Sequence, residues 1–236
     1  MKHTVVITGG TKGLGRETAL AFAHAGALVV ALYAGDEAAA EAFRAEFKAA
    51  GLAGLAWKQD VTTADPSIWT RPEILAADQL TLIHNACAPF APKPMHQLTW
   101  QDFENNQRVA VKGAWECSQP LLRLMLKKKT GTIITILSAA IEGAPPKGFA
   151  AYVTAKHALR GFTLALAAEY AGRGVKIFSV SPGYMDTPLT RQWDDRLRQM
   201  IRDHAGRLTV PAAAARQIVS LAGSADIPGQ GENHPV

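Results

Sequence analysis

Short apolar runs alternate with helical patterns along most of the chain. Six apolar runs have the length of buried strands, and between them apolar residues recur every three or four positions, as in an amphipathic helix. The predicted strands are 4–8, 28–33, 55–61, 80–85, 132–137 and 175–180. The predicted helices are 13–25, 36–50, 67–77, 99–128 and 150–172, with a break at Pro72 and a bend near Gly113 or Pro120.

Continuous apolar strands that alternate with helices predict a parallel sheet covered on both faces. Because crossovers between parallel strands are right-handed, the expected fold is α/β: a doubly wound parallel sheet of six to seven strands in one domain over 1–236. Such sheets bind ligands just beyond the carboxyl ends of their strands. The residues that follow each strand are therefore the first candidates for a site.

Composition narrows the class of protein. Of 236 residues, 48% are hydrophobic and 19% charged, an ordinary globular balance. Cys87 and Cys117 form no CxxC pair, so neither a disulfide framework nor a thiolate metal site is expected. No apolar run has the length of a membrane span, and the start does not read as a signal peptide, so a cytoplasmic protein is expected. The net charge of +5 is scattered, and its tightest run, 127–129, is typical of a solvated helix end rather than a nucleic-acid site.

A glycine-rich turn, TGGTKGLG over 8–15, follows the first predicted strand and leads into a helix. Glycine lets the backbone approach a pyrophosphate closely, and the free N–H groups of a helix N-terminus attract it. The spacing TGxxxGxG is a variant of the dinucleotide fingerprint. Its place between a strand and a helix favours nucleotide binding over a plain turn.

The end of the second strand indicates which dinucleotide is preferred. A carboxylate there would accept the adenine ribose hydroxyls and favour NAD. The chain has YAG at 33–35 instead, with Asp36 further along, while Thr11 and Lys12 of the glycine turn are in reach of a 2′-phosphate. The pattern therefore favours NADPH; the alternative is that Lys12 is merely solvated.

A serine, a tyrosine and a lysine form the candidate catalytic set. Ser138 follows the fifth predicted strand, and Tyr152 and Lys156 lie four positions apart on the next helix. Because residues i and i+4 share a helix face, the phenol and the ammonium should be neighbours. A nearby cation lowers the pKa of a tyrosine, and a serine hydroxyl can hold a substrate oxygen. A YxxxK pair alone is common by chance, but joined to the serine and the glycine turn it is a strong signal.

With these residues the chain resembles the short-chain dehydrogenases and reductases over nearly its whole length. The matching motifs are TGGTKGLG at 8–15, Asp60-Val61, Asn85-Ala86, Ser138, Tyr152-xxx-Lys156, and Pro182-Gly183 with Thr187. Within that family the chain is most similar to 3-oxoacyl-(acyl-carrier-protein) reductases. The resemblance implies a Rossmann-like fold, an oligomer, and reduction of a ketone to a secondary alcohol with NADPH.

The resemblance also implies a role for each matching residue. Ser138 and Tyr152 would bind the substrate carbonyl, with Tyr152 as proton donor, and Lys156 would hold the nicotinamide ribose. The implied cofactor contacts are Gly9, Gly13, Leu14 and Gly15 at the pyrophosphate, Asp60 and Val61 at the adenine, Asn85 and Ala86 at the riboses, and Pro182, Gly183, Met185 and Thr187 at the nicotinamide. No metal takes part.

The chain departs from the family pattern at two positions near the site. Cys87 stands where a glycine is usual, and we interpret it as a small buried residue rather than a reactive thiol. Ala110 stands where the family usually has an asparagine that helps to hold a proton-relaying water, and alanine cannot hydrogen-bond. Asn106, one helical turn earlier, either substitutes for it or is a solvated or capping residue.

Further segments carry expectations about substrate and partners. The segment 190–210 is the expected substrate lid, and the helix segment 159–168, apolar on more than one face, favours a subunit interface. Over 229–236 the usual glycine-rich end is missing and Pro235 should spoil a strand interior, so one interface is expected to differ. Lys129 and Arg173 match positions beside the active-site mouth at which related reductases dock an acidic acyl carrier protein. Because both precede strands, the alternative is that they are solvated helix ends that complement the C-terminal dipole.

Three functions stay open. The leading hypothesis is an NADPH-dependent ketoreductase of a 3-oxoacyl thioester on an acyl carrier protein, as in fatty acid or polyketide synthesis. The second is a reductase or dehydrogenase of a free ketone or alcohol. The third is a weakly active, NADP-binding subunit of a hetero-oligomer with a homologous active partner; Ala110 favours it, and the intact Ser138, Tyr152 and Lys156 argue against it.

Overall fold

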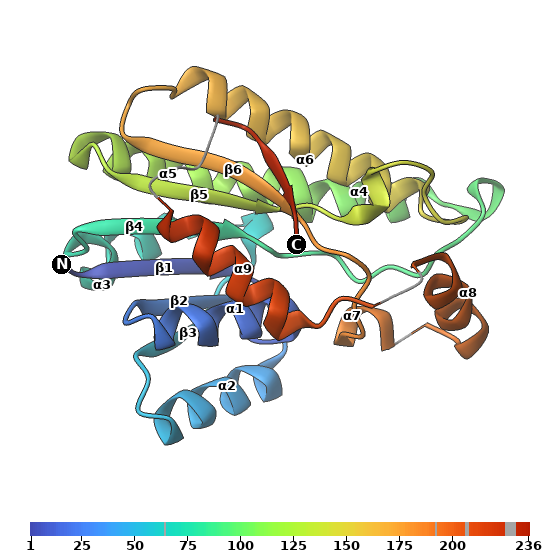
Figure 1. The fold of residues 1–236 in the computed structure, drawn as a ribbon, viewed down its shortest axis with the longest axis horizontal. Coiled ribbons are helices and arrows are strands. Elements are labelled where there is room, and N and C mark those ends of the chain that lie inside the picture. The colour runs from blue at the N-terminus through green and yellow to red at the C-terminus, as the bar shows by residue number, and fades with distance from the viewer. Residues whose placement is uncertain (64, 192, 206–207, 225–229) are drawn as a thin grey trace.

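One parallel sheet organises the chain in a computed structural model that describes residues 1–236 except 64, 192, 206–207 and 225–229 (Figure 1). Its seven described strands follow the order β3-β2-β1-β4-β5-β6-β7, and every neighbouring pair is parallel. The strands are β1 (His3–Thr8), β2 (Leu28–Tyr33), β3 (Gly54–Lys58), β4 (Gln79–His84), β5 (Gly131–Ile136), β6 (Val175–Ser181) and β7 (Asn233–Pro235). The predicted doubly wound fold is confirmed, and its strand order reverses between β1 and β4.

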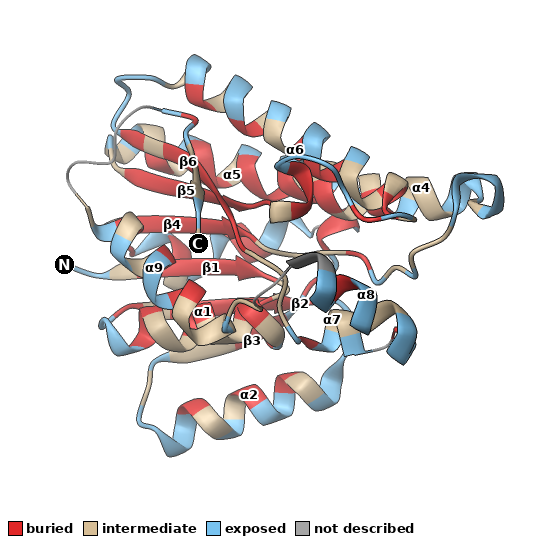
Figure 2. Cartoon of the chain, turned by 45° about the vertical axis from the view of Figure 1, so that its right-hand side comes forward, coloured by how far each residue is buried: buried red, intermediate tan, exposed pale blue. Residues whose placement is uncertain are grey.

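Helices cover both faces of the sheet and leave it buried between two hydrophobic cores (Figure 2). Successive side chains of a strand point to opposite faces, so β1 sends Val5 and Ile7 into one core and Val6 into the other. The first core is covered by α1 (Gly13–His24), α2 (Glu37–Ala49) and α9 (Pro211–Gly223), and the second by α3 (Pro72–Leu75), α5 (Gly113–Lys128) and α6 (Ala150–Glu169).

The predicted long helix 99–128 is divided by a wider turn. The helix α4 (Trp100–Gln107) starts with a capping box between Thr99 and Asp102, and the π-helical segment Arg108–Lys112 joins it to α5. Gly113 begins α5, and a Cβ atom added at this glycine would lie 2.6 Å from Val61 Cγ2. Pro120 lies inside the same helix. The π-helical turn thus lies just before Gly113, at one of the two positions proposed for a bend.

Pro235 does not prevent a seventh strand, contrary to the expectation from the sequence. Val236 N donates to Ser181 O, and Gly183 N donates to Val236 O, both at 3.2 Å. Along a strand of a parallel sheet, the backbone N–H and C=O groups of successive residues point alternately toward the two sides. Because the groups of Val236 point toward β6, those of Pro235 point toward the outer edge of the sheet. The missing N–H of Pro235 therefore costs no hydrogen bond.

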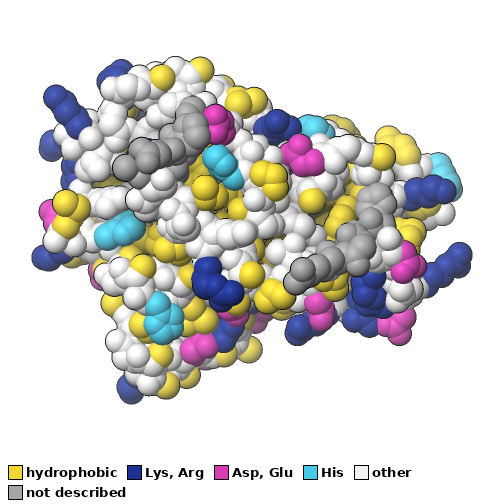
Figure 3. Space-filling model, in the orientation of Figure 1, with side chains coloured by type: hydrophobic (Ala, Val, Ile, Leu, Met, Phe, Trp, Pro, Cys, Tyr) yellow, Lys and Arg dark blue, Asp and Glu magenta, His cyan; other side chains and the backbone are white. Residues whose placement is uncertain are grey.

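Two short helices lie beyond the carboxyl ends of the strands, α7 (Pro188–Arg191) and α8 (Asp195–Ala205) (Figure 1). They occupy most of the predicted lid 190–210, of which 192 and 206–207 lie outside the described residues. Lys and Arg side chains are spread over the face shown in Figure 3, with acidic side chains among them. None of the described helices has the length and apolar character needed to cross a membrane.

Candidate active site

The side chains of Asn85 and Thr8 fasten the glycine turn to the end of β4. Asn85 Nδ2 donates to Thr8 O at 2.9 Å and to Gly9 O at 3.0 Å, and Thr8 Oγ1 accepts from the N–H groups of Asn85 and Ala86. Gly9 and Gly13 have φ values of 63° and 57°, a backbone conformation that residues other than glycine rarely adopt. The sequence therefore folds these residues into a turn at the point where the strand order reverses.

The helix α1 begins directly behind this turn and offers a place for an anion. Lys12 is its N-cap residue without a capping side chain, and the first turn contains no acidic residue. A Cβ atom at Gly15 would lie 2.3 Å from Gly9 O, so only glycine lets the turn pack on the helix this closely. The residues present fit a pyrophosphate held by backbone N–H groups.

Ser138, Tyr152 and Lys156 line one cavity of about 270 Å³ together with the glycine turn. Ser138 follows β5 and accepts a hydrogen bond from Ala140 N, which fixes it at the sheet edge. Lys156 is 4% exposed; its Nζ donates to Ile136 O at 2.7 Å and lies 5.7 Å from the centroid of the Tyr152 ring. The predicted catalytic set is thus brought together at the carboxyl ends of the strands.

Burial controls the protonation of this set. Desolvation raises the pKa of Tyr152 above its ordinary value of 10, and the hydrogen bond with Ser138 lowers it by a smaller amount. Desolvation also lowers the pKa of Lys156. The sequence led us to expect a lowered pKa for Tyr152; in the structure burial outweighs the favourable contacts, and the phenol keeps its proton at neutral pH. A neutral phenol is suited to give a proton to a carbonyl oxygen.

This direction of shift predicts how the free chain titrates. We expect the tyrosinate absorbance of Tyr152, which is the part of the signal that Tyr152→Phe removes, to appear only above pH 10. A raised pKa shifts the ionisation of the phenol to higher pH. Ultraviolet titration of the wild type minus the variant, within the pH range where the circular dichroism is constant, measures it. A difference signal that develops between pH 7 and 9 would instead show a lowered pKa.

Most of the predicted site residues line the same cavity. Those that do are Gly9, Lys12, Gly13, Leu14, Gly15, Asn85, Ala86, Ser138, Tyr152, Lys156, Pro182, Gly183, Met185 and Thr187. Thr11 is buried beside the turn, while Asp60 and Val61 lie at the end of β3, where Asp60 Oδ1 accepts from Thr62 N. A cofactor contact of these three stays a prediction.

Comparison with known proteins identifies the family. A family model described as short chain dehydrogenase matches residues 3–198. The chain is a member of the short-chain dehydrogenase family. It is therefore an NAD(P)-dependent oxidoreductase.

Individual relatives of this short-chain dehydrogenase carry several activities. It is 33% identical over 190 residues to the 3-oxoacyl-(acyl-carrier-protein) reductase of Synechocystis, a match that covers 80% of this chain and 76% of the relative. The 3-ketoacyl-(acyl-carrier-protein) reductase of Brucella melitensis, solved with NADH, has a TM-score of 0.87 at 25% identity over 99% and 96% of the two chains. A protein of Beutenbergia cavernae assigned as an NAD(P)-dependent gluconate 5-dehydrogenase, solved with NADP, has a TM-score of 0.86 at 30% identity over 99% and 94%.

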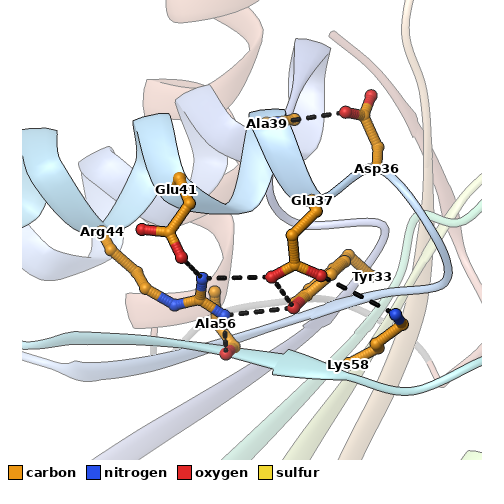
Figure 4. Close-up of polar contacts among 8 residues, drawn as sticks. All are labelled: Tyr33, Asp36, Glu37, Ala39, Glu41, Arg44, Ala56 and Lys58. Atoms are coloured by element: carbon orange, nitrogen blue, oxygen red, sulfur yellow. Dashed lines mark hydrogen bonds and ion pairs between the residues drawn. The ribbon is translucent and has the colours of Figure 1, made fainter.

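The end of β2 carries more charge in this short-chain dehydrogenase than its sequence suggested. The Tyr33 hydroxyl donates to Glu37 Oε1 at 2.8 Å and accepts from Arg44 Nη2 at 3.1 Å, and Lys58 lies 3.8 Å from the same carboxylate (Figure 4). Asp36 caps α2 by accepting from Ala39 N. Its other oxygen binds Lys12 Nζ at 2.7 Å, so the cation expected to meet a 2′-phosphate has a partner in the chain.

Neither candidate for the relay of protons reaches the cavity. Ala110 lies in the π-helical segment, 8% exposed in a cluster that includes Leu137 and Ile141. Asn106 is 5% exposed and its Nδ2 donates to Asp102 O at 2.9 Å. Neither is among the described residues that line the cavity, so Asn106 is a buried helix residue rather than a solvated one.

Other residues that line the cavity could be recognised in the sequence only weakly or not at all. Cys87 lines the cavity, its thiol donates to Ala88 O, and burial raises its pKa, which fits a packed residue rather than a reactive thiol. Phe90, Phe149 and Trp193 also line it, although they come from three segments far apart in the sequence. An aromatic residue in a loop is not by itself a sign of a site, so only their meeting in space reveals them.

Lys129 and Arg173 lie away from the cavity. Lys129 ends α5 in the left-handed conformation, just before β5, and Arg173 precedes β6. Both therefore stand at the amino ends of their strands, whereas the cavity is at the carboxyl ends. Neither residue flanks the cavity of its own chain, and docking of a carrier protein by Lys129 and Arg173 stays a prediction.

Proposed function

We propose that this chain reduces the ketone of a 3-oxoacyl thioester to a secondary alcohol with NADPH. The observation that carries the proposal is the meeting of Ser138, Tyr152 and Lys156 in the cavity that the glycine turn lines. The relatives named as 3-oxoacyl-(acyl-carrier-protein) reductases support the thioester, since two of them are similar to this chain over most of its length.

The residues of the chain define the chemistry. Ser138 and Tyr152 donate hydrogen bonds to the substrate oxygen and so fix the carbonyl. When bound, a nicotinamide cofactor supplies the hydride that the carbonyl carbon accepts. The O–H bond of Tyr152 then breaks and its proton passes to the oxygen, which completes the alcohol. Lys156, held by Ile136 O under the phenol, favours the phenolate that is left.

Oxidation of NADPH by the purified chain tests the proposal. We expect loss of absorbance at 340 nm with the 3-oxobutanoyl thioester of N-acetylcysteamine, and faster turnover when the same acyl group is on an acyl carrier protein. Turnover of free ketones but not of either thioester would favour the free-ketone reductase. NADPH binding without turnover of any ketone would favour a subunit that supports an active partner.

The preference for NADPH over NADH depends on the pair between Lys12 and Asp36. The two side chains are 52% and 42% exposed, so the pair is weak and an incoming phosphate dianion can displace the carboxylate. We expect Lys12→Ala to weaken NADPH binding about fivefold and to leave NADH binding unchanged, as the loss of one exposed charge contact implies. Fluorescence titration with both cofactors measures this.

The matched variant is Asp36→Asn. Asparagine caps a helix about as well as aspartate, so α2 should keep its N-terminus. Removal of the negative charge frees Lys12 and should tighten NADPH binding while NADH binding stays the same. If NADH binds more tightly than NADPH to the wild type, the assignment of Lys12 to a 2′-phosphate is wrong.

We also propose a homo-oligomer with an interface on α5 and α6. Trp115 is 49% exposed on α5 and Leu164 is 47% exposed on α6, which are large apolar surfaces to leave in water.

Docking of a carrier protein by Lys129 and Arg173 would serve the cavity of another copy. Sedimentation of the purified chain tests the oligomer, and replacement of both basic residues by Glu should raise KM for the carrier-bound substrate alone.

A further inference from the structure

A cluster of three aromatic rings lies beside Tyr152, and we call its members, Phe90, Phe149 and Trp193, the aromatic box. The Phe90 ring stacks on the Tyr152 ring, with centroids 4.7 Å apart and planes 12° apart. Phe149 meets Tyr152 edge to face at 5.9 Å. Trp193 meets both phenylalanines edge to face, at 5.5 Å from Phe90 and 5.6 Å from Phe149. All of these rings line the cavity.

The aromatic box is a fixed part of the structure. The indole N–H of Trp193 donates to Phe90 O at 2.9 Å, which joins the segment after α7 to the loop after β4. Trp193 is 7% exposed and Phe149 3% exposed, and Ile201 of α8 packs in the same cluster. Because burial and a hydrogen bond hold them, these rings keep fixed positions beside Tyr152.

The cavity provides almost no charge for a substrate. Among the described residues that line it, Lys12 and Lys156 carry the formal charges. Lys12 is paired with Asp36 at the glycine turn, and Lys156 is bound to Ile136 O below the phenol. A carboxylate or a sugar acid beside Tyr152 would lose its hydration and would have to draw one of these lysines away from its present partner.

The nearest arginines are in a different hollow. Arg198 and Arg202 of α8 line a hollow of about 80 Å³, which shares with the main cavity the lining residues Tyr184, Met185, Thr190 and Trp193. Arg198 is paired with Asp195 on its own helix. Trp193 lines both hollows, whereas these two arginines are not among the described residues that line the main cavity.

We propose that the aromatic box selects aryl ketones, in which the carbonyl carries a flat aromatic ring, and that Phe90 and Trp193 determine this specificity. The inference rests on the ketone reduction proposed above. Aromatic pairs prefer offset or edge-to-face contact, and the box offers both arrangements to a ring bound beside the phenol. A saturated ring of the same size is thicker and has no π face. The second substituent of the carbonyl, such as a thioester chain, would extend into the rest of the cavity.

Paired ketones test the selection. We expect kcat/KM for 1-phenylethanone to exceed that for 1-cyclohexylethanone by at least tenfold in the wild type. Phe90→Leu and Trp193→Leu should lower that ratio at least threefold below the wild-type value, and they should lower kcat/KM for 1-phenylethanone more than kcat/KM for butanone, which has no ring. Using the ratio between variants cancels the intrinsic difference in reactivity of the two carbonyls. Trp100→Leu, at a side chain that is 77% exposed and outside the cavity lining, is the matched control.

The outcomes separate this inference from the proposed function. Equal loss of all three ketones in Phe90→Leu and Trp193→Leu would show that the box only positions Tyr152, and an unchanged ratio would show that it does not select; either result overturns the proposal. If no ketone is reduced at all, calorimetry in the presence of oxidised cofactor measures the affinity for each of the two ring ketones. Tighter binding of 1-phenylethanone than of 1-cyclohexylethanone would then support the box while the ketoreductase function fails, and equal binding would overturn both.

Discussion

Tyr152→Phe is expected to lower the rate of ketone reduction by at least about 10², because it removes one oxygen that donates the proton and leaves everything else in place. Phenylalanine keeps the ring that stacks on Phe90, so the cavity should keep its shape. Burial raises the pKa of the tyrosine, and so the proton is present on the donor at neutral pH rather than supplied by solvent. Steady-state turnover of a 3-oxobutanoyl thioester measures the effect.

Two controls accompany this prediction. NADPH affinity should stay within twofold, since Ser138, Lys156 and the glycine turn are unchanged. Tyr170→Phe, at the carboxyl end of α6 and outside the cavity lining, should keep wild-type turnover. Near-normal turnover in Tyr152→Phe would remove Tyr152 as proton donor and, with it, the geometric basis of the proposed function.

Gly15→Ala should abolish cofactor binding, with an affinity for NADPH at least 100-fold lower. The added Cβ atom would lie 2.3 Å from Gly9 O and 2.6 Å from Asn85 Nδ2, and both atoms belong to the bond network that fastens the turn to β4. To relieve these contacts the turn must move, which breaks the anion site at α1. Fluorescence titration gives the affinity, and thermal unfolding shows the accompanying loss of stability.

Gly161→Ala is the matched control for the same chemical change. Gly161 is inside α6, and a Cβ atom there would meet nothing within 4 Å. Alanine favours a helix over glycine by up to about 1 kcal/mol, so this variant should be as stable as the wild type or more so. A Gly15→Ala chain that binds NADPH within threefold of the wild type would contradict the packing described for the turn.

The sequence carried enough information to predict the sheet, because each strand is a separate apolar run. The predicted strand 28–33 agrees with β2 residue for residue. The predictions for β1 and β6 differ by one residue at one end, those for β4 and β5 are displaced by one residue, and β3 ends three residues before the predicted strand 55–61 does. The positions of Ser138, Tyr152 and Lys156 followed from the same pattern, since the carboxyl ends of parallel strands meet at one edge.

What the sequence could not provide depends on contacts between distant segments. The π-helical turn at Arg108–Lys112 leaves no pattern that differs from an α-helix, and the raised pKa of Tyr152 depends on how deeply its phenol is buried. Phe90 and Trp193 are 103 positions apart and meet only through the packing of α8 and the loop after β4. Pro235 was misjudged because the sequence does not tell which side of an edge strand a residue faces.

The strand order also determines how the molecule must be assembled in time. The central strand β1 pairs with β4, which the chain reaches only after two complete strand-and-helix units, and α1 packs against α9 from the other end of the sequence. Long-range pairings of this kind slow folding, because loops must close before the contacts that stabilise them can form. A nascent chain that leaves the ribosome therefore carries its glycine turn exposed, without the Asn85 bonds, until β4 has been made, and recovery of NADPH binding should follow the slowest refolding phase.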